Sequence, residues 1–402
     1  MKLIRLLILA AAVFAAGCCC GRTEKVIDSK TSFAREALQE FIDSGELPGV
    51  ISVFYKDGVQ ETACLGWADV DKKIPMTMDK MFMQCSQTKG FCGVTIAILV
   101  EEGKLSLDDP VAKYLPEFKN LKVIDKDKNG KRIVRKAKNV LTVRMVMNHT
   151  GGFPFEIPSK VKKGWAKVSL KDTVREAASL PLRFEPGTRA QYSNTGIDIG
   201  AAVTEVITGK PWDVFLKERV LDPLEMKDTT FQPTEEQLAR SIQMYDVKGG
   251  TKAKYKAFNR WMPLPHNGPT VFPSAGAGLW TTAADQLKFY KMLMNLGVGV
   301  NGKRILKAET VKNLLMKSTR PAGLGNYSLG LTTPANGWIG HGGAWGTSCS
   351  VNWQKRQLRL WVVQYNGKYP YPWSRKWGYA NDKFFAQKVN TAEGDAYTGR
   401  LK

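Results

Sequence analysis

Ser86 and Lys89 are residues of this chain whose types and spacing could do chemistry. Three residues along a helix make roughly one turn, so the hydroxyl and the amine would lie on one face, within reach of each other. A serine hydroxyl is a poor nucleophile at neutral pH, and a neighbouring amine with a lowered pKa can take its proton. If Ser86 lies in the first helical turn, its backbone N–H is also a donor for a developing oxyanion. The pair therefore indicates acyl transfer.

The sequence that follows the pair distinguishes it from a chance match. Serine and lysine with this spacing are common on helix surfaces, where both side chains are simply solvated. Here the run from Gly90 to Val100 is apolar nearly all round, and Gly103 is typical of the residue that ends a helix. Such a helix is expected to be buried, and an exposed polar pair at its start would have no structural purpose.

Two further stretches could complete a site. Tyr192 and Asn194 are two residues apart, so both side chains can point the same way from an irregular loop that begins near Glu185. His341 and Gly343 lie in a glycine-rich stretch that reads as a strand, where a substrate could approach the backbone closely. Each stretch alone is typical of ordinary packing, but their conjunction in this order is hard to obtain by chance.

The elements that must position these residues are strand-like at both ends of the chain and helical in the middle. A helix is expected from Phe33, with Thr31 or Ser32 as its cap, followed by a hairpin that turns at Asp57-Gly58. Helical periodicity dominates from 142 to 224, Thr281-Thr282 can cap a helix over 283–296, and a last helix is expected over 377–389. Three antiparallel strands are expected over 338–345, 347–353 and 357–365.

These elements predict an α/β (α+β) fold with an antiparallel β-sheet built from both chain ends and flanked by helices. The sheet lobe would span about 31–103 and 270–390, and an inserted, mostly helical lobe about 104–269. Residues 391–402 would form a C-terminal tail. The basic insertion between Lys119 and Asn139 resembles the start of a calcium loop, but Lys136 stands where the bidentate glutamate would be. A hairpin turning at Asn129-Gly130 is therefore the favoured interpretation.

On these motifs the chain resembles the serine β-lactamase and penicillin-binding superfamily, in its class C branch, from about residue 35 to residue 367. The resemblance implies that Ser86 is the nucleophile and that Lys89 and Tyr192 transfer its proton. It further implies that Asn194 holds Lys89 and the substrate amide, and that backbone N–H groups of Ser86 and Ala344, beside Gly343, form the oxyanion hole. We expect no cofactor and no metal.

His341 stands where class C β-lactamases carry lysine, and it resembles the DD-peptidase and D-aminopeptidase pattern instead. With a reference pKa of about 6.5 it would be mostly neutral at pH 7, and it would gain charge as the pH falls toward about 6. We therefore expect a serine hydrolase that acts on an ester or amide, like a carboxylesterase or a D-amino-acid peptidase. The alternatives are a class C β-lactamase or DD-carboxypeptidase acting on β-lactams or peptidoglycan peptides, and a catalytically inactive envelope-binding lipoprotein.

The N-terminus predicts export. Residues 1–17 combine the early cations Lys2 and Arg5 with a short apolar run, and they resemble a bacterial lipoprotein signal that ends before a lipidated Cys18, with a tether over 18–30. Removing those two cations from the net charge of +22 leaves +20 for the remaining chain, which would be drawn to anionic envelope surfaces. The periplasmic side of the outer membrane is the expected location, without a nucleic-acid partner.

Cysteines and histidines indicate neither a disulfide framework nor a metal centre. The cysteines beyond the anchor are Cys64, Cys85, Cys92 and Cys349, and the spacing of the middle two is too long for a bridge within a helix. We expect buried thiols. The three histidines lack metal-like spacing, which argues against zinc; His149 is assigned to loop packing and His266 is left without a role.

Overall fold

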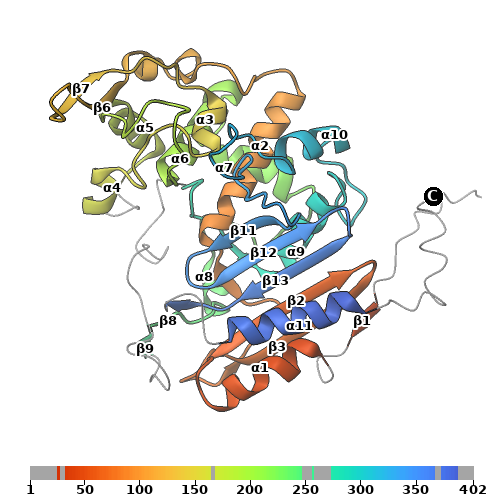
Figure 1. The fold of residues 1–402 in the computed structure, drawn as a ribbon. Coiled ribbons are helices and arrows are strands. Elements are labelled where there is room, and N and C mark those ends of the chain that lie inside the picture. The colour runs from red at the N-terminus through yellow and green to blue at the C-terminus, as the bar shows by residue number, and fades with distance from the viewer. Residues whose placement is uncertain are drawn as a thin grey trace, which may run out of the picture.

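The computed structural model describes residues 25–27, 32–163, 168–246, 256–257, 273–366 and 373–387 (Figure 1). The predicted leader, the Cys18 anchor, His266 and the C-terminal tail lie outside these residues. Part of the predicted tether forms strand β1 (Lys25–Ile27), which the sequence did not predict. Among the described residues, no helix combines the length and the apolar character needed to cross a membrane.

Both ends of the chain build the main sheet, as predicted. Its seven strands run in the order β1-β3-β2-β13-β12-β11, with β4 attached to β3. All neighbours pair antiparallel except β1, which pairs parallel with β3. The strands after β1 are β2 (Gly49–Lys56), β3 (Val59–Asp69), β4 (Ile74–Pro75), β11 (Ile339–Gly343), β12 (Thr347–Asn352) and β13 (Gln357–Val362).

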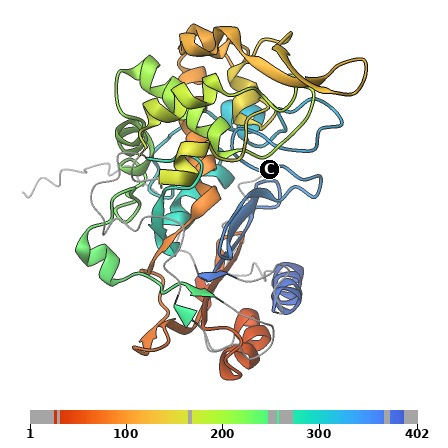
Figure 2. The same ribbon diagram turned by 90° about the vertical axis from the view of Figure 1, so that its left-hand side faces the viewer.

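The two faces of this sheet are covered by different helices (Figures 1 and 2). Helices α1 (Phe33–Asp43) and α11 (Ser374–Ala386) pack on one face through an apolar cluster that includes Leu38, Phe54 and Phe384. Ser32 caps α1 by accepting from the Arg35 N–H at 3.0 Å, as one of the two predicted caps. Helix α9 (Ala283–Met294), capped by Thr282 as predicted, lies on the other face.

The middle of the chain forms the predicted helical lobe. Its helices are α3 (Val143–Met147), α4 (Pro158–Lys163), α5 (Leu170–Ser179), α6 (Asn194–Thr208), α7 (Trp212–Leu216) and α8 (Glu235–Ala239). The basic insertion forms the predicted hairpin from β6 (Lys122–Lys126) and β7 (Arg132–Lys136). The short remaining elements are β8 (Tyr245–Asp246), β9 (Lys256–Ala257), β14 (Tyr365–Asn366) and α10 (Ala308–Thr310).

Helix α2 (Thr88–Glu101) joins the two lobes, because its residues from Thr88 to Leu99 are all buried. Its Phe91 ring stacks on Phe289 of α9, with ring centroids 3.7 Å apart. A fully buried phenylalanine stabilises a fold by about 1.5–3 kcal/mol through the apolar area it removes from water. One continuous apolar cluster therefore runs from the sheet through α2 into the helical lobe. This packing fixes the start of α2, where the candidate nucleophile lies.

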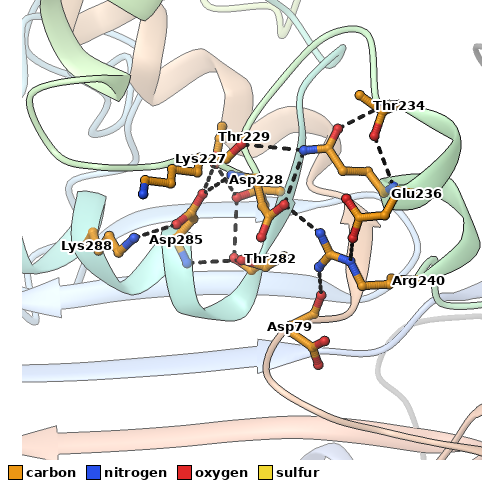
Figure 3. Close-up of polar contacts among 12 residues, drawn as sticks. Asp79, Lys227, Asp228, Thr229, Thr234, Glu236, Arg240, Thr282, Asp285 and Lys288 are labelled. Atoms are coloured by element: carbon orange, nitrogen blue, oxygen red, sulfur yellow. Dashed lines mark hydrogen bonds and ion pairs between the residues drawn. The ribbon is translucent and has the colours of Figure 1, made fainter.

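The strand that leads into this start is held by a polar network (Figure 3). Strand β5 (Met81–Met83) pairs with β10 (Trp280–Thr282), and Arg240 donates to the Asp79 carbonyl at 2.6 Å just before β5. The same guanidinium bonds Asp228 at 2.7 Å and Glu236 at 2.9 Å. Charge-assisted bonds of this kind are stronger than neutral ones. The network ties β5 to α8, so the chain enters the site from a fixed position.

The cysteines form no disulfide among the described residues, in line with the prediction. Cys85, Cys92 and Cys349 are buried free thiols, and Cys64 is a half-buried one. Burial raises the pKa of the Cys64 thiol to about 11, so this side chain stays protonated and unreactive at neutral pH.

Candidate active site

Ser86 lies in a tight turn between β5 and α2, directly before the helix in whose first turn the sequence allowed it to lie. Residues Cys85–Gln87 form a 3₁₀ turn, and α2 begins at Thr88. Cys85 holds a φ of 50°, which is unusual for a residue with a side chain. Such local strain costs on the order of 1–3 kcal/mol and tends to occur at functional sites. The turn leaves the Ser86 side chain half-buried, while residues on both sides of it are buried.

Lys89 is fully buried and its amine contacts three oxygen atoms. Its Nζ lies 3.1 Å from the Ser86 Oγ, 2.5 Å from the Asn194 Oδ1 and 2.6 Å from the Gly276 carbonyl oxygen. Burial lowers the pKa of Lys89 to about 7, against the opposing charges of Asp198 and Glu156. About half of the amines would then be neutral at pH 7.

The neutral amine has the geometry of a general base. It carries two N–H donors and one lone pair, and an amide oxygen or a carbonyl oxygen can only accept. When the two N–H groups donate to Asn194 and Gly276, the lone pair is directed to the Ser86 hydroxyl. The neighbours of Lys89 therefore select the orientation in which it can take the proton of Ser86.

Tyr192 and Asn194 reach the same point from the start of α6. Asn194 is the first residue of that helix and is buried, whereas the sequence predicted an irregular loop; Ser193 provides the helix cap. The Lys89 Nζ lies 4.6 Å from the centre of the Tyr192 ring. The Tyr192 side chain is 37% exposed, but desolvation of its hydroxyl inside the site raises its pKa above the usual value of about 10, while a hydrogen bond with Ser86 lowers it. Tyr192 is therefore a neutral phenol at physiological pH.

His149 orders Tyr192, which agrees with its predicted packing role. Its ring lies between those of Tyr192 and Tyr327, with both centroid separations at 4.5 Å. Its Nδ1 accepts from the Ser193 N–H at 3.3 Å. Burial holds the pKa of His149 well below its ordinary value, so the imidazole is neutral and can accept that bond. The ring thereby fixes the segment that carries Tyr192 and Asn194.

Behind Asn194 lies a charge network that the sequence reasoning missed. The Asn194 Nδ2 donates to Glu156 at 2.6 Å, and Lys160 forms ion pairs with Glu156 at 3.0 Å and with Asp198 at 2.8 Å. Asp198 also accepts from the Gly276 N–H at 3.1 Å. The Glu156-x-x-x-Lys160 spacing is a helical ion-pair signal, but Pro158 lies between the two residues and hides it. The network holds both acceptors of the Lys89 amine, Asn194 and Gly276.

His341 lies on β11 as predicted, but its ionisation differs from the expectation. Burial and the Lys89 charge lower the pKa of His341 to about 3. Its Nδ1 bonds the Gly342 carbonyl at 2.5 Å, so that nitrogen must carry the hydrogen, and its Nε2 accepts from the Tyr327 hydroxyl at 3.0 Å. The Tyr192 hydroxyl lies 3.5 Å from the same Nε2. The expected gain of charge toward about pH 6 is therefore wrong, because the ring stays neutral there.

Gly343 and Ala344 lie beside the Ser86 turn. A Cβ atom on Gly343 would fall 2.3 Å from the Gln84 carbonyl oxygen, a distance that only a glycine permits. Strand β11 ends at Gly343, two positions before its predicted end, and Ala344 is an exposed turn residue. The close approach brings the Ala344 backbone next to the turn that carries Ser86. An oxyanion hole made of two backbone N–H groups requires such proximity.

No metal-binding cluster accompanies these residues. Among the described side chains, histidine, cysteine and carboxylate groups nowhere gather in a set of three that could hold an ion. In the predicted hairpin, the Asp127 carboxylate accepts hydrogen bonds from the backbone N–H groups of Asn129 and Lys131, at 2.8 and 2.9 Å. The segment that imitates a calcium loop is therefore a hairpin turn.

Comparisons with known proteins identify the family of this chain. The family model described as "Beta-lactamase" matches residues 34–372. The Mycobacterium tuberculosis "Protein Rv1367c" is 30% identical over 291 residues, which cover 71% of each chain. The solved structure of "EstCE1, a hydrolase with promiscuous acyltransferase activity" superposes with a TM-score of 0.70 at 21% identity, over 87% of this chain and 97% of its own.

A second solved structure has the same fold. The D-stereospecific amidohydrolase from Streptomyces sp. superposes with a TM-score of 0.62 at 21% identity, over 88% of this chain and 98% of its own. At this identity both structural likenesses show the fold alone. The family match, however, spans most of the chain and includes every element that carries the site. The chain therefore belongs to the Beta-lactamase family and is a serine hydrolase.

Proposed function

We propose that this serine hydrolase forms a covalent acyl-enzyme on Ser86 with an ester or amide substrate, like a carboxylesterase or a D-amino-acid peptidase. The observation that carries the proposal is the buried Lys89 amine, whose pKa is lowered to about 7 and which lies 3.1 Å from the Ser86 Oγ. A base with a pKa near the working pH gives the best combination of neutral form and proton affinity. A buried structural lysine would also need acceptors, so the lowered pKa next to the Ser86 hydroxyl is what favours a role as a base.

The proposed steps follow the protons. Neutral Lys89 takes the Ser86 proton while the Oγ attacks the substrate carbonyl, and the carbonyl oxygen becomes an oxyanion facing the Ser86 and Ala344 N–H groups. Such a donor typically contributes about 3–4 kcal/mol to transition-state stabilisation. The proton then passes through the Tyr192 hydroxyl to the leaving alcohol or amine as its bond to the carbonyl carbon breaks. Water then attacks the acyl-enzyme carbonyl while neutral Lys89 takes a proton from it. Lys89 gives this proton to the Ser86 Oγ as the bond between Oγ and the acyl carbon breaks, so the carboxylic acid leaves and both Ser86 and neutral Lys89 are regenerated.

A neutral substrate suits this site better than a carboxylate. Penicillins and wall peptides carry a carboxylate that a cationic lysine would bind, and this chain has His341 at that position. Because its pKa is lowered to about 3, His341 offers no positive charge at neutral pH. Two structural neighbours, a hydrolase with promiscuous acyltransferase activity and a family VIII carboxylesterase, support acyl transfer on this fold.

The alternative enzymatic function is that of a class C β-lactamase or a DD-carboxypeptidase. It is tested by comparing kcat/KM for a neutral short-chain ester with kcat/KM for a cephalosporin at neutral pH. We expect the ester to be turned over much faster. A kcat/KM of about 10⁶ M⁻¹s⁻¹ for the cephalosporin, within the usual range of a good enzyme, would establish this alternative function. The D-stereospecific amidohydrolase among the structural neighbours makes a D-amino-acid amide the natural third substrate to include.

Covalent labelling tests the nucleophile and the inactive-lipoprotein reading together. Wild-type protein incubated with a fluorophosphonate should gain the mass of one phosphonyl group, and Ser86→Ala should gain none. Ser179→Ala, at an exposed serine on α5, is the matched control and should label like wild type. Labelling that persists in Ser86→Ala would remove Ser86 as the nucleophile. No labelling and no ester hydrolysis by the wild type would favour the inactive reading.

We further propose that the protein is exported and anchored by lipid on Cys18, on the periplasmic side of the outer membrane. The support is the pattern of residues 1–18, in which two cations precede a short apolar run that ends in small residues before a cysteine. Cys19 is not the aspartate that retains lipoproteins at the inner membrane. Intact mass of the membrane fraction should show the diacylglyceryl modification on Cys18.

A further inference from the structure

The hairpin formed by β6 and β7 projects from the helical lobe at the end of the molecule opposite α1 and α11 (Figure 1). Between Lys119 and Asn139 it carries nine lysine and arginine side chains against two aspartates. The register of the two strands shows where these cations lie, because residues directly opposite each other in an antiparallel pair share one face. The two faces of this hairpin have different compositions.

The inner face holds the hairpin on the protein. It carries Val123, which is 1% exposed, opposite Arg135. Arg135 forms ion pairs with Asp125 on the same face, at 2.6 Å, and with Glu185 of the helical lobe. Strand β6 is also bonded to Leu182, whose carbonyl accepts from the Ile124 N–H at 2.8 Å. The contacts of Val123 and Arg135 on the inner face thus hold the hairpin on the fold, while Ile133, opposite Asp125 on the same face, is 37% exposed.

The outer face is built differently. Its cross-strand pairs are Lys122 opposite Lys136, Ile124 opposite Val134, and Lys126 opposite Arg132. Two pairs of like charges therefore flank one apolar pair. The four cations are exposed, and none of them forms an ion pair within the described part of the chain. Val134 is 51% exposed.

Such a face does not stabilise the hairpin by itself. Like charges directly opposite each other in a sheet are destabilising, and an exposed valine does not add to stability, because its apolar surface stays in water. Along a strand, residues four apart are separated by about 13 Å, so the two cation pairs lie on either side of the apolar pair. The face has the pattern of an interfacial membrane element, in which lysine and arginine bind phosphate groups while an apolar centre enters the acyl boundary.

We propose that this outer face, consisting of Lys122, Ile124, Lys126, Arg132, Val134 and Lys136, binds the surface of an anionic lipid bilayer. A soluble polyanion would use the cations but would leave Val134 and the exposed part of the half-buried Ile124 in water. The membrane is therefore the partner that accounts for all six side chains. The surface would hold the hairpin end of the helical lobe on the bilayer, in addition to any contact made by the N-terminal segment.

The test measures partition of the full-length chain onto vesicles, by co-sedimentation at low ionic strength. Vesicles of phosphatidylcholine alone are compared with vesicles that also contain phosphatidylglycerol. The outer-face variant replaces Lys122, Lys126, Arg132 and Lys136 with glutamine. The matched control replaces four exposed lysines elsewhere, Lys227, Lys303, Lys307 and Lys317, with glutamine and thus loses the same charge. The rest of the chain is the same in wild type, outer-face variant and control, so any membrane binding by other segments contributes equally to all three.

Each cation at an anionic surface is worth about 1 kcal/mol, or roughly fivefold in affinity. We therefore expect the outer-face variant to lose at least tenfold in binding to the anionic vesicles, and the control to lose much less. Equal losses in both variants would overturn the proposal, because net charge alone would then explain binding. Wild-type binding that does not depend on phosphatidylglycerol would overturn it as well.

A second variant tests the apolar pair. Val134→Ser keeps every charge, so it should weaken binding to anionic vesicles but leave binding to soluble polyphosphate unchanged. Equal vesicle binding by wild type and Val134→Ser, with strong polyphosphate binding by both, would assign the face to a soluble polyanion instead. Ester hydrolysis by all variants should match wild type, since the hairpin contributes no residue to the Ser86 site.

Discussion

The ionisation of Lys89 gives the most direct test of the proposed chemistry. With an ordinary pKa of 10.5, only about one amine in 3,000 would be neutral at pH 7, whereas with a pKa of about 7 half of them are neutral. Burial is the main cause of the lowered pKa, and the carboxylates of Asp198 and Glu156 oppose it. If neutral Lys89 is the base, kcat/KM must follow the neutral fraction.

The assay is hydrolysis of a neutral activated ester between about pH 5 and pH 9, with background hydrolysis subtracted at each pH. We expect kcat/KM to rise about tenfold per pH unit well below 7 and to level off above about 8, because the base is then fully neutral. A rate that still rises tenfold per unit above about pH 8.5 would refute the reasoning, since Lys89 would then be a cation at physiological pH. A flat profile would equally exclude it.

A single substitution should move the ascending limb of the pH profile, which is the range over which kcat/KM rises with pH, in a known direction. Asn194→Asp puts a carboxylate in place of the amide whose oxygen lies 2.5 Å from the Lys89 Nζ. An opposite charge this close favours the ammonium form and raises its pKa by about one to three units. The ascending limb should move up by that amount. Asn301→Asp, an exposed site outside the active site, is the control and should leave the limb in place. A limb that stays near pH 7 in Asn194→Asp would assign the titration to another group.

Three further outcomes follow from the same structure. The pKa of Lys89 is lower in the folded state than in the unfolded state, so between these two values the unfolded state binds more protons and the free energy of unfolding rises with pH. From about pH 7 to pH 9, the free energy of unfolding of the wild type, measured with urea, should rise by about 2 kcal/mol relative to that of Lys89→Met. Lys160→Met leaves the buried Glu156 and Asp198 without their cation and should cost about 3–5 kcal/mol, much of it recovered by adding Glu156→Gln, as measured by the same unfolding. Cys18→Ser should release the protein from membranes during a high-salt wash, which strips purely electrostatic contacts; a variant that stays bound would contradict the lipid anchor.

The sequence predicted the parts of the site that depend on local spacing. Ser86 and Lys89 are three residues apart at the start of an apolar helix, so their contact and the burial of Lys89 follow from helical geometry and from the residues after them. The hairpin at Asp57-Gly58 and the strands β11 to β13 were likewise predictable, because alternating apolar residues and turn signals fix short antiparallel pairs.

The parts that depend on tertiary packing could not be predicted in the same way. Asn194 meets Lys89 across 105 residues of sequence, and its other partner, Glu156, comes from a third segment. Lys160 reads as one more cation in the basic run of α4, yet its side chain is fully buried between two carboxylates. Residue type and spacing show which groups could react. Only the packed structure shows which charges lie close enough to set their pKa values.

His341 shows how this difference changes a functional prediction. The reference pKa of histidine suggested a cationic clamp that would switch on toward about pH 6. In the structure, burial and the Lys89 charge lower the pKa of His341 to about 3, so no such switch exists in this range. The same surroundings would act on a lysine placed there, because burial disfavours any cation. His341→Lys should therefore improve cephalosporin turnover relative to ester turnover only modestly, and its effect should grow as the pH falls and the new amine gains its proton. A large gain that does not change between about pH 6 and 8 would show that position 341 is open to solvent when substrate binds.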